Sequence, residues 1–311
     1  MVALRSADVL PIHRVNRREA ELRRAIVEAV AYADVFDWPL TPGEIRRDLP
    51  IAARQVEVDL ALASPLMRET VWARDGLVTL AGREWLGPRR RGSAASSARL
   101  WSRARPWLTL IAALPFVRLV AISGSLAVAA AAADADVDLF IVTDDGRLWL
   151  ARALTIAVVR LAARRDMHLC PNYLLARSAL ALPERDRFTA HELAQLLTVA
   201  ADETHAELLA ANPWYRGHLP NHPGPPPPVR GLPWPGLKPH VERLLRRPVF
   251  DRLEAREMGR KAARLRAAAG TNVEARFDRQ VCKGHLGEHR RRTLRAFGER
   301  VERLARLESV P

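Results

Sequence analysis

The chain has 311 residues, an apolar fraction of 49% and a net charge of +14 at neutral pH. This length suffices for two or three domains, and two cysteines are too few for a disulfide framework, which fits a reducing, cytoplasmic setting. No apolar run is long enough to span a bilayer, and no apolar segment follows the arginines near the N-terminus, so neither a membrane protein nor a secretory signal is expected.

Arginine supplies most of the positive charge. Only three of the 49 basic residues are lysines, and residues 237–311 hold 20 basic and 10 acidic residues, a net charge of +10. A basic region of this kind is typical of proteins that bind nucleic acid or another polyanion. The dominance of arginine and alanine is equally typical of a GC-rich coding bias, with the charges on solvated faces. Both interpretations stay open.

Residues 20–86 have the pattern of a winged-helix-like domain. Thr41 stands before Pro42 and Glu44, which favours an N-cap and the start of a short helix. Asp75-Gly76 lies between two β-prone runs and predicts a hairpin. The expected elements are helices over Arg23–Asp34, Pro42–Leu49 and Ala53–Ala63, then strands over Thr70–Trp72 and Leu77–Leu80.

Residues 87–215 alternate between strand-like and helix-like segments, which predicts a small α+β or α/β domain with a mixed sheet. Its expected strands are Phe116–Ile122, Asp136–Val142 and Met167–Leu175. Its expected helices are Arg89–Ala113, broken near Pro106, then Leu126–Ala133, Arg147–Arg164 and Thr189–Ala211.

The rest of the chain divides by composition. Residues 216–236 are rich in proline, with eight prolines from His218 to Gly236, and are expected to form a semi-rigid linker or a surface meander. Residues 237–311 are expected to form a basic, mostly helical region interrupted around Gly270.

Two acidic residues stand at the beginning of the second expected strand of the central domain. Asp136 and Asp138 alternate there with Val137, Leu139 and Ile141. Residues i and i+2 of a strand point to the same face, so the two carboxylates are expected side by side, roughly 6–7 Å apart at Cα. Carboxylates this close repel unless a cation lies between them, and Mg²⁺ takes such oxygen ligands together with substrate phosphates.

A glycine–serine pair precedes these acids. Gly124 and Ser125 follow the expected strand Phe116–Ile122 and open the next expected helix. A turn of this kind presents backbone N–H groups and a hydroxyl to phosphate oxygens, and glycine lets a phosphate approach the backbone closely.

The order strand, Gly-Ser, short helix and then Asp-x-Asp on the next strand resembles the DNA polymerase β-like nucleotidyltransferase superfamily. The resemblance covers about 60–80 residues and rests on Gly124, Ser125, Asp136 and Asp138. The wider chain is similar to a bacterial group that joins a winged-helix-like N-terminal region to such a domain. The similar segments are Asp34–Thr41, Gly146–Trp149 and Leu169–Tyr173.

The resemblance implies a Mg²⁺- or Mn²⁺-dependent nucleotidyltransferase. Asp136 and Asp138 would be the catalytic metal ligands, and the cations would serve the transfer of a nucleoside monophosphate from an NTP. The acceptor would be a hydroxyl of a small molecule, a protein or an RNA end. Gly124 and Ser125 would bind the nucleotide. Arg147 begins a helix beyond the strand and is either a further nucleotide-binding residue or a surface arginine.

One feature departs from the superfamily's pattern. The family usually carries a third carboxylate on a later strand, but the expected strand Met167–Leu175 contains no acid. Asn172 is the polar residue best placed there, and its amide can bind a cation or nucleotide but cannot take a proton. His191 and Glu192 lie on an expected helix without the spacing of a zinc protease, so they are interpreted as ordinary helix residues.

Other functions remain possible for such a chain. A winged-helix region could make it a DNA-binding regulator with a degenerate transferase domain, or an antitoxin-like interaction protein. The third expected helix would contact DNA in such a domain, but it carries Glu57 and Asp59 beside Arg54 and is not basic. Contact with protein is therefore favoured over contact with DNA for this helix.

Overall fold

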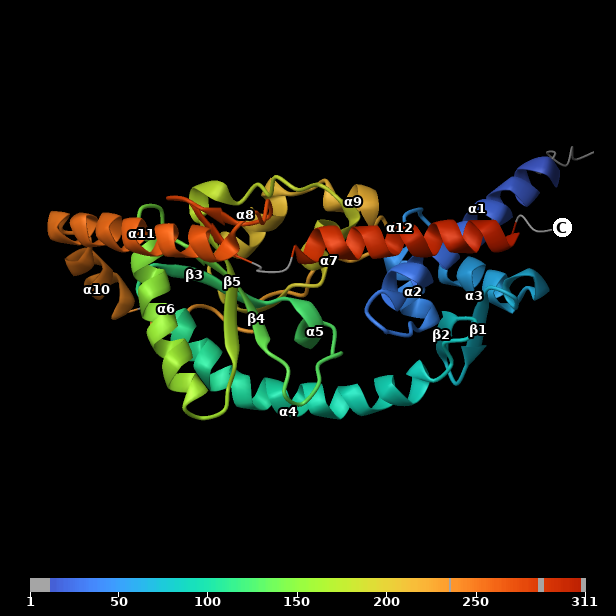
Figure 1. The fold of residues 1–311 in the computed structure, drawn as a ribbon, viewed down its shortest axis with the longest axis horizontal. Helices are drawn as coiled ribbons and strands as arrows, with labels where there is room; N and C mark the ends of the chain where they lie inside the picture. The colour runs from blue at the N-terminus through green and yellow to red at the C-terminus, as the bar shows by residue number, and fades with distance from the viewer. Residues whose placement is uncertain (1–11, 235, 285–287, 309–311) are drawn as a thin grey trace, which may run out of the picture. The chain divides into compact units, whose positions relative to one another are not determined.

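The computed structural model describes residues 12–234, 236–284 and 288–308. These residues form a mixed α+β structure with twelve α-helices, a six-stranded mixed sheet and a two-stranded antiparallel sheet (Figure 1). The chain divides into two compact units, one of residues up to 87 with 218–222 and 297 onward, the other of residues 88–217 and 223–296. Within the described ranges, no helix is both long and apolar enough to cross a membrane.

Three helices and a hairpin make up most of the first unit. They are α1 (Ile12–Asp34), α2 (Pro42–Asp48), α3 (Gln55–Ala63), β1 (Val71–Arg74) and β2 (Leu77–Leu80). Thr41 caps α2, because its hydroxyl accepts a hydrogen bond from the Glu44 backbone and the Glu44 carboxylate accepts one from the Thr41 backbone. Asp75 and Gly76 both have positive φ, which fits the hairpin turn predicted from their sequence.

The second unit is built on the six-stranded sheet, with the strand order β6-β3-β4-β5-β8-β7. Only β4 and β5 pair in parallel, and the other neighbours are antiparallel. The strands are β3 (Val117–Ile122), β4 (Val137–Thr143), β5 (Leu169–Ala176), β6 (Leu197–Ala201), β7 (Arg276–Phe277) and β8 (Val281–Lys283). Its helices are α4 (Leu86–Ala113), which begins in the first unit, α5 (Gly124–Ala127), α6 (Leu148–Ala163), α7 (Arg187–Ala194), α8 (Thr204–Ala211), α10 (Lys238–Leu245) and α11 (Pro248–Ala269). The remaining helices are α9 (Tyr215–His218) and α12 (His289–Glu308).

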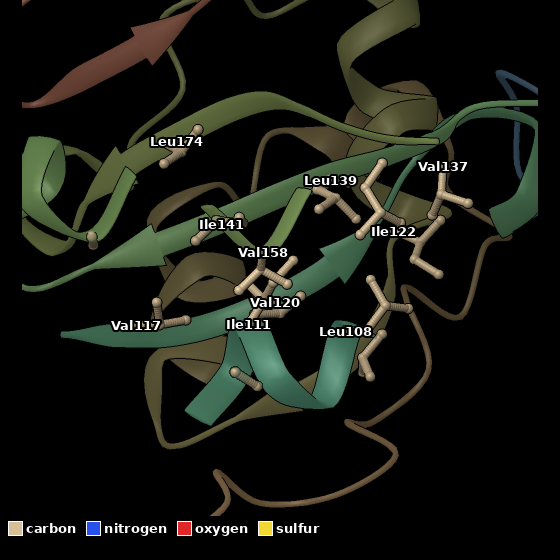
Figure 2. Packing of buried hydrophobic residues seen from close by; sticks show 14 of the residues in the cluster. Leu108, Ile111, Val117, Val120, Ile122, Val137, Leu139, Ile141, Val158 and Leu174 are labelled. Atoms are coloured by element: carbon tan, nitrogen blue, oxygen red, sulfur yellow. The ribbon is translucent and has the colours of Figure 1, made fainter. Parts of the chain in front are cut away.

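One face of the sheet packs into an apolar core, shown in Figure 2. Val137, Leu139 and Ile141 of β4 are completely buried there, as their alternation with the acids predicts. Leu108 and Ile111 of α4 belong to the same core. The helix α4 continues through Pro106, where the sequence predicts a break. Because alternate residues point to opposite faces, this core directs Asp138 and Phe140 to the other face of the sheet.

The predicted helix Thr189–Ala211 is wrong as a single element. The structure has α7, the strand β6 and α8 in its place, and α7 begins after Asp186, which caps it, rather than at Thr189. β6 pairs with β3, from which it is separated by more than 70 residues in the chain. The pairing with β3 provides hydrogen-bond partners for the buried backbone of β6. The local sequence pattern of such a short apolar segment does not distinguish a strand from a helix.

The predicted helix Leu126–Ala133 is also wrong in its length. α5 is a single turn that ends at Ala127, and Ala129 has a positive φ of 57°. The following alanines are held by α4 instead, since the Ser97 hydroxyl accepts a hydrogen bond from Ala131 N at 3.0 Å. Tertiary contacts here override the high helix propensity of alanine.

The C-terminal region is less purely helical than its sequence predicts. β7 and β8 come from this region and extend the central sheet, with Leu174 of β5 opposite Cys282 of β8. The proline-rich segment follows the sheet edge at Val229 and Arg230, because Val229 N donates to Thr198 O at 3.0 Å and Arg230 O accepts from Ala201 N. Residues 218–222 of the same segment belong to the first unit, so the linker and the surface meander both stay predictions.

Candidate functional site

Asp136 and Asp138 stand at the start of β4, as their sequence pattern predicts. Asp136 is exposed just before the strand, and Asp138 is half-buried in its second position. Burial raises the pKa of Asp138 to about 6, and the charge of Asp136 adds to this rise while a hydrogen bond from Asn172 opposes it. The charge of Asp136 thus disfavours the ionised form of Asp138, an effect that a bound cation would relieve.

Gly124 lies directly against Asp138. The backbone N–H of Ser123 donates to Asp138 O at 3.0 Å, which fixes the end of β3 beside the start of β4. Gly124 has a φ of 66°, and a Cβ at this position would lie 2.7 Å from the Asp138 carboxylate oxygen Oδ2. Only glycine fits this conformation and this space, so the turn holds its backbone at the carboxylate.

Ser125 follows in the one-turn helix α5 and is exposed. Its backbone carbonyl accepts a hydrogen bond from Ala130 N at 2.8 Å, so its neighbourhood is ordered although the predicted helix is short. The predicted contribution of a helix N-terminus is therefore limited to the backbone N–H groups of one turn.

Asn172 of β5 contacts Asp138 through its amide nitrogen, which donates to the carboxylate oxygen Oδ1. Its amide oxygen accepts a hydrogen bond from the Cys170 thiol at 2.7 Å. Burial, together with the charges of Asp138 and Asp136, raises the pKa of Cys170 to about 11, so the thiol keeps the proton it donates. This chain fixes the orientation of the Asp138 carboxylate, and in it Asn172 acts as a donor rather than as an oxygen ligand.

Arg147 is not brought to these carboxylates. It precedes α6, beyond the opposite end of β4, a strand of seven residues that spans roughly 20 Å. Its guanidinium is buried in an ion pair with Asp251 at 2.6 Å and lies over the ring of Phe116. Arg147 thus has structural partners here, and the nucleotide-binding role expected for it stays a prediction.

Glu192 of α7 is a third carboxylate in this region. It comes from a helix and not from β5, the strand on which the superfamily's pattern predicts an acid. Its side chain lines the same pocket as Ser123 and Asn172. Burial raises the pKa of Glu192 to about 7, and the charge of Asp138 adds to the rise. No local pattern links Glu192 to residues more than 50 positions earlier, so only the packing of α7 reveals this proximity.

The pocket beside Asn172 encloses about 630 Å³, counting the space that is open to solvent. Phe140 and Tyr173 form part of its wall from the same face of the sheet as Asp138, with their rings edge to face at 5.2 Å. α7 contributes the facing side, including Glu192.

The residues present fit a divalent cation that is shared with a substrate. Among the described residues, no group of three or more His, Cys, Asp or Glu side chains could hold a metal alone. Two adjacent carboxylates, one of them pressed against the Gly124 backbone, match the way Mg²⁺ binds through one or two carboxylates plus phosphate oxygens and water.

Comparisons of the chain with protein-family models, with curated proteins and with solved structures found no match.

Proposed function

We propose that this protein transfers a nucleoside monophosphate from an NTP to a hydroxyl acceptor in a Mg²⁺-dependent reaction. The observation that carries the proposal is the position of Asp138: its carboxylate fills the space where a Cβ of residue 124 would lie, and the charge of Asp136 acts on it. An acidic pair beside a glycine turn is suited to hold the triphosphate of a nucleotide through a shared cation.

Asp136 and Asp138 would hold Mg²⁺ or Mn²⁺, which when bound neutralises phosphate charge and favours ionisation of the acceptor hydroxyl. The acceptor oxygen forms a bond to the α-phosphorus, and the bond from that phosphorus to the pyrophosphate oxygen breaks. Pyrophosphate leaves with the bonding electron pair. The chain's own contribution is positioning and charge placement.

The surrounding residues have separate tasks in this scheme. The backbone at Gly124 and Ser125 would donate hydrogen bonds to phosphate oxygens. Asn172 holds the Asp138 carboxylate in one orientation. The carboxylate of Glu192, from α7, would accept the proton that the acceptor hydroxyl loses, a task that the amide of Asn172 cannot perform.

A second candidate function is contact with another protein through α3. Val56 and Leu60 of this helix are 53% and 69% exposed, and Glu57 and Asp59 lie between them. Exposed apolar residues mixed with acids suit a protein surface better than a phosphate backbone. This favours an interaction module over a DNA-binding regulator. Binding of nucleic acid by the basic C-terminal region stays a separate prediction.

The proposed transfer is tested by incubating the full-length protein with α-labelled NTPs, Mg²⁺ and cell extract. We expect labelled products that disappear with EDTA and fall at least about a hundredfold in Asp136→Asn and in Asp138→Asn. Asp134→Asn, in the exposed loop just before them, is the matched control and should keep full labelling. Labelling that survives in the Asp136 and Asp138 variants would refute this site.

A further inference from the structure

The pocket beside Asp138 has mostly apolar walls. Its apolar lining comes from the sheet, from α7 and from the segments that flank this helix. The residues are Phe140, Tyr173, Leu182, Phe188, Leu193 and Leu196. Two aromatic pairs stiffen it, because the rings of Phe140 and Tyr173 lie 5.2 Å apart and that of Phe188 lies 5.7 Å from His289. Such walls suit a flat apolar group.

The permanently charged groups at the rim of the pocket are already paired. Lys283 forms an ion pair with Glu184 at 2.9 Å and lies over the ring of Tyr173. Arg290 forms ion pairs with Asp186 and with Glu274, the latter at 3.5 Å. Neither cation is left for an anionic ligand, which disfavours the phosphates of an RNA end.

Glu192 differs from these groups. Its carboxylate lines the pocket, and within the described part of the chain it makes no hydrogen bond or ion pair. A carboxyl group in an apolar wall without a donor is costly to maintain, and a ligand that supplies a donor removes this cost. Glu192 lines this pocket together with Ser123 and Asn172, and both of these residues donate hydrogen bonds to Asp138.

We propose that this pocket binds a small, uncharged aromatic or similarly flat apolar molecule whose hydroxyl donates to Glu192. The inference rests on the proposed function, in which that hydroxyl is the acceptor of the nucleoside monophosphate. The acceptor is thereby a small molecule rather than an RNA end, because the phosphates of an RNA end would meet two pocket cations, Lys283 and Arg290, that are already paired with carboxylates.

The test uses the full-length protein without NTP or metal and three probes of one shape. They are 2-naphthol, which carries a donor, 2-methoxynaphthalene, which carries none, and 2-naphthoate, which carries a negative charge. Isothermal titration should show 2-naphthol binding at least about tenfold more tightly than 2-methoxynaphthalene, with 2-naphthoate weakest. Equal affinities, or no binding of any probe, would overturn the proposal.

Variants locate the binding. Glu192→Met should remove the preference for 2-naphthol and bring the ratio of the two affinities near one. Glu207→Met, a carboxylate of α8 outside the pocket, is the control and should keep the preference. If Glu192→Met does not fold, Phe188→Ala serves instead, because this half-exposed wall residue should weaken all three probes several-fold. If Glu192→Met folds and keeps the preference for 2-naphthol, the probe binds elsewhere and the proposal is overturned. If that variant does not fold, unchanged probe affinities in Phe188→Ala overturn the proposal in the same way.

The two proposals can fail separately. Selective binding of 2-naphthol by a protein that transfers nothing leaves the pocket proposal standing and refutes the proposed function. Transfer to RNA or protein by a protein that binds no probe refutes the pocket proposal alone. Asp138→Asn should abolish transfer and keep selective binding of 2-naphthol, since Asp138 borders the pocket without lining it.

Discussion

Among single residues, Gly124 shows how the site depends on the absence of a side chain. Its positive φ and the closeness of Asp138 are two separate reasons for glycine. Gly146 has a similar φ of 70°, but a Cβ there would meet open space. Gly146 is therefore a control for Gly124 that has the same backbone conformation without a neighbouring carboxylate.

We therefore expect Gly146→Ala to lower the free energy of unfolding by about 1–2 kcal/mol, from the left-handed backbone alone, and Gly124→Ala to lower it by more, because its Cβ also clashes with Asp138. Gly124→Ala should in addition weaken nucleotidyl transfer at least about tenfold, because its Cβ displaces the Asp138 carboxylate. Urea unfolding and the labelling assay measure the two effects. Equal activity in both alanine variants would contradict the role given to this turn.

Lys238 is a buried lysine whose ammonium donates to the backbone carbonyls of Ala112 at 2.9 Å and Val117 at 2.5 Å. Burial lowers its pKa to about 8, and repulsion from Arg118 contributes. The folded state therefore loses this proton at a lower pH than the unfolded state does. Below pH 8 the buried charge lowers the free energy of unfolding by its full amount. This destabilisation decreases as the pH rises from 8 to 10.5.

The wild type should accordingly gain stability relative to Lys238→Met by up to about 3 kcal/mol between pH 8 and pH 10.5. Urea denaturation of both proteins across this pH range gives the difference between their unfolding free energies as a function of pH. A difference that stays constant with pH would show that Lys238 titrates alike in both states.

At the scale of elements, α10 is attached to the sheet through buried charges. Arg118 of β3 bonds to Asp144 and to Glu242 of α10, each at 2.6 Å, and Arg246 also reaches Asp144. Glu242 further accepts the backbone N–H of Phe116 at 2.7 Å. The side chains of Arg118, Asp144 and Glu242 are 14%, 12% and 8% exposed, so removing one partner leaves a buried charge uncompensated.

Glu242→Gln should therefore reduce the free energy of unfolding by about 3 kcal/mol. The control is Glu302→Gln, which breaks a pair with Arg306 in which both side chains are more than 70% exposed and should cost less than about 0.5 kcal/mol. Chemical denaturation of the two variants gives the comparison. Equal losses would mean that the α10 cluster contributes no more than a surface pair.

Elements with a strong local signal could be predicted from the sequence, and elements that depend on distant partners could not. The Thr41 cap and the Asp75-Gly76 turn contain their own chemistry, and both are found as predicted. β6 and β8 are short strands that pair with strands far away in the chain, so their identity is decided by the sheet.

For the molecule as a whole, the same limit separates the predicted part of the site from the missed part. Gly124 and Asp136 lie in the connection between the adjacent strands β3 and β4, and Asp138 is the second residue of β4, so sequence spacing predicts their closeness. Glu192 reaches the region only through the packing of α7. Arg147 lies close to Asp138 in the sequence, but the length of β4 separates the two residues in the structure.

The account as a whole rests on Asp136 and Asp138 sharing a cation with a triphosphate. The most direct measurement is a crystal structure of the full-length protein with Mn²⁺ and an NTP analogue that cannot be cleaved between the α- and β-phosphates. We predict anomalous density for manganese within bonding distance of both carboxylates, with the triphosphate along the Gly124–Ser125 backbone. Manganese and triphosphate bound elsewhere, or an Asp138 carboxylate without metal at saturating Mn²⁺ and analogue, would contradict the account.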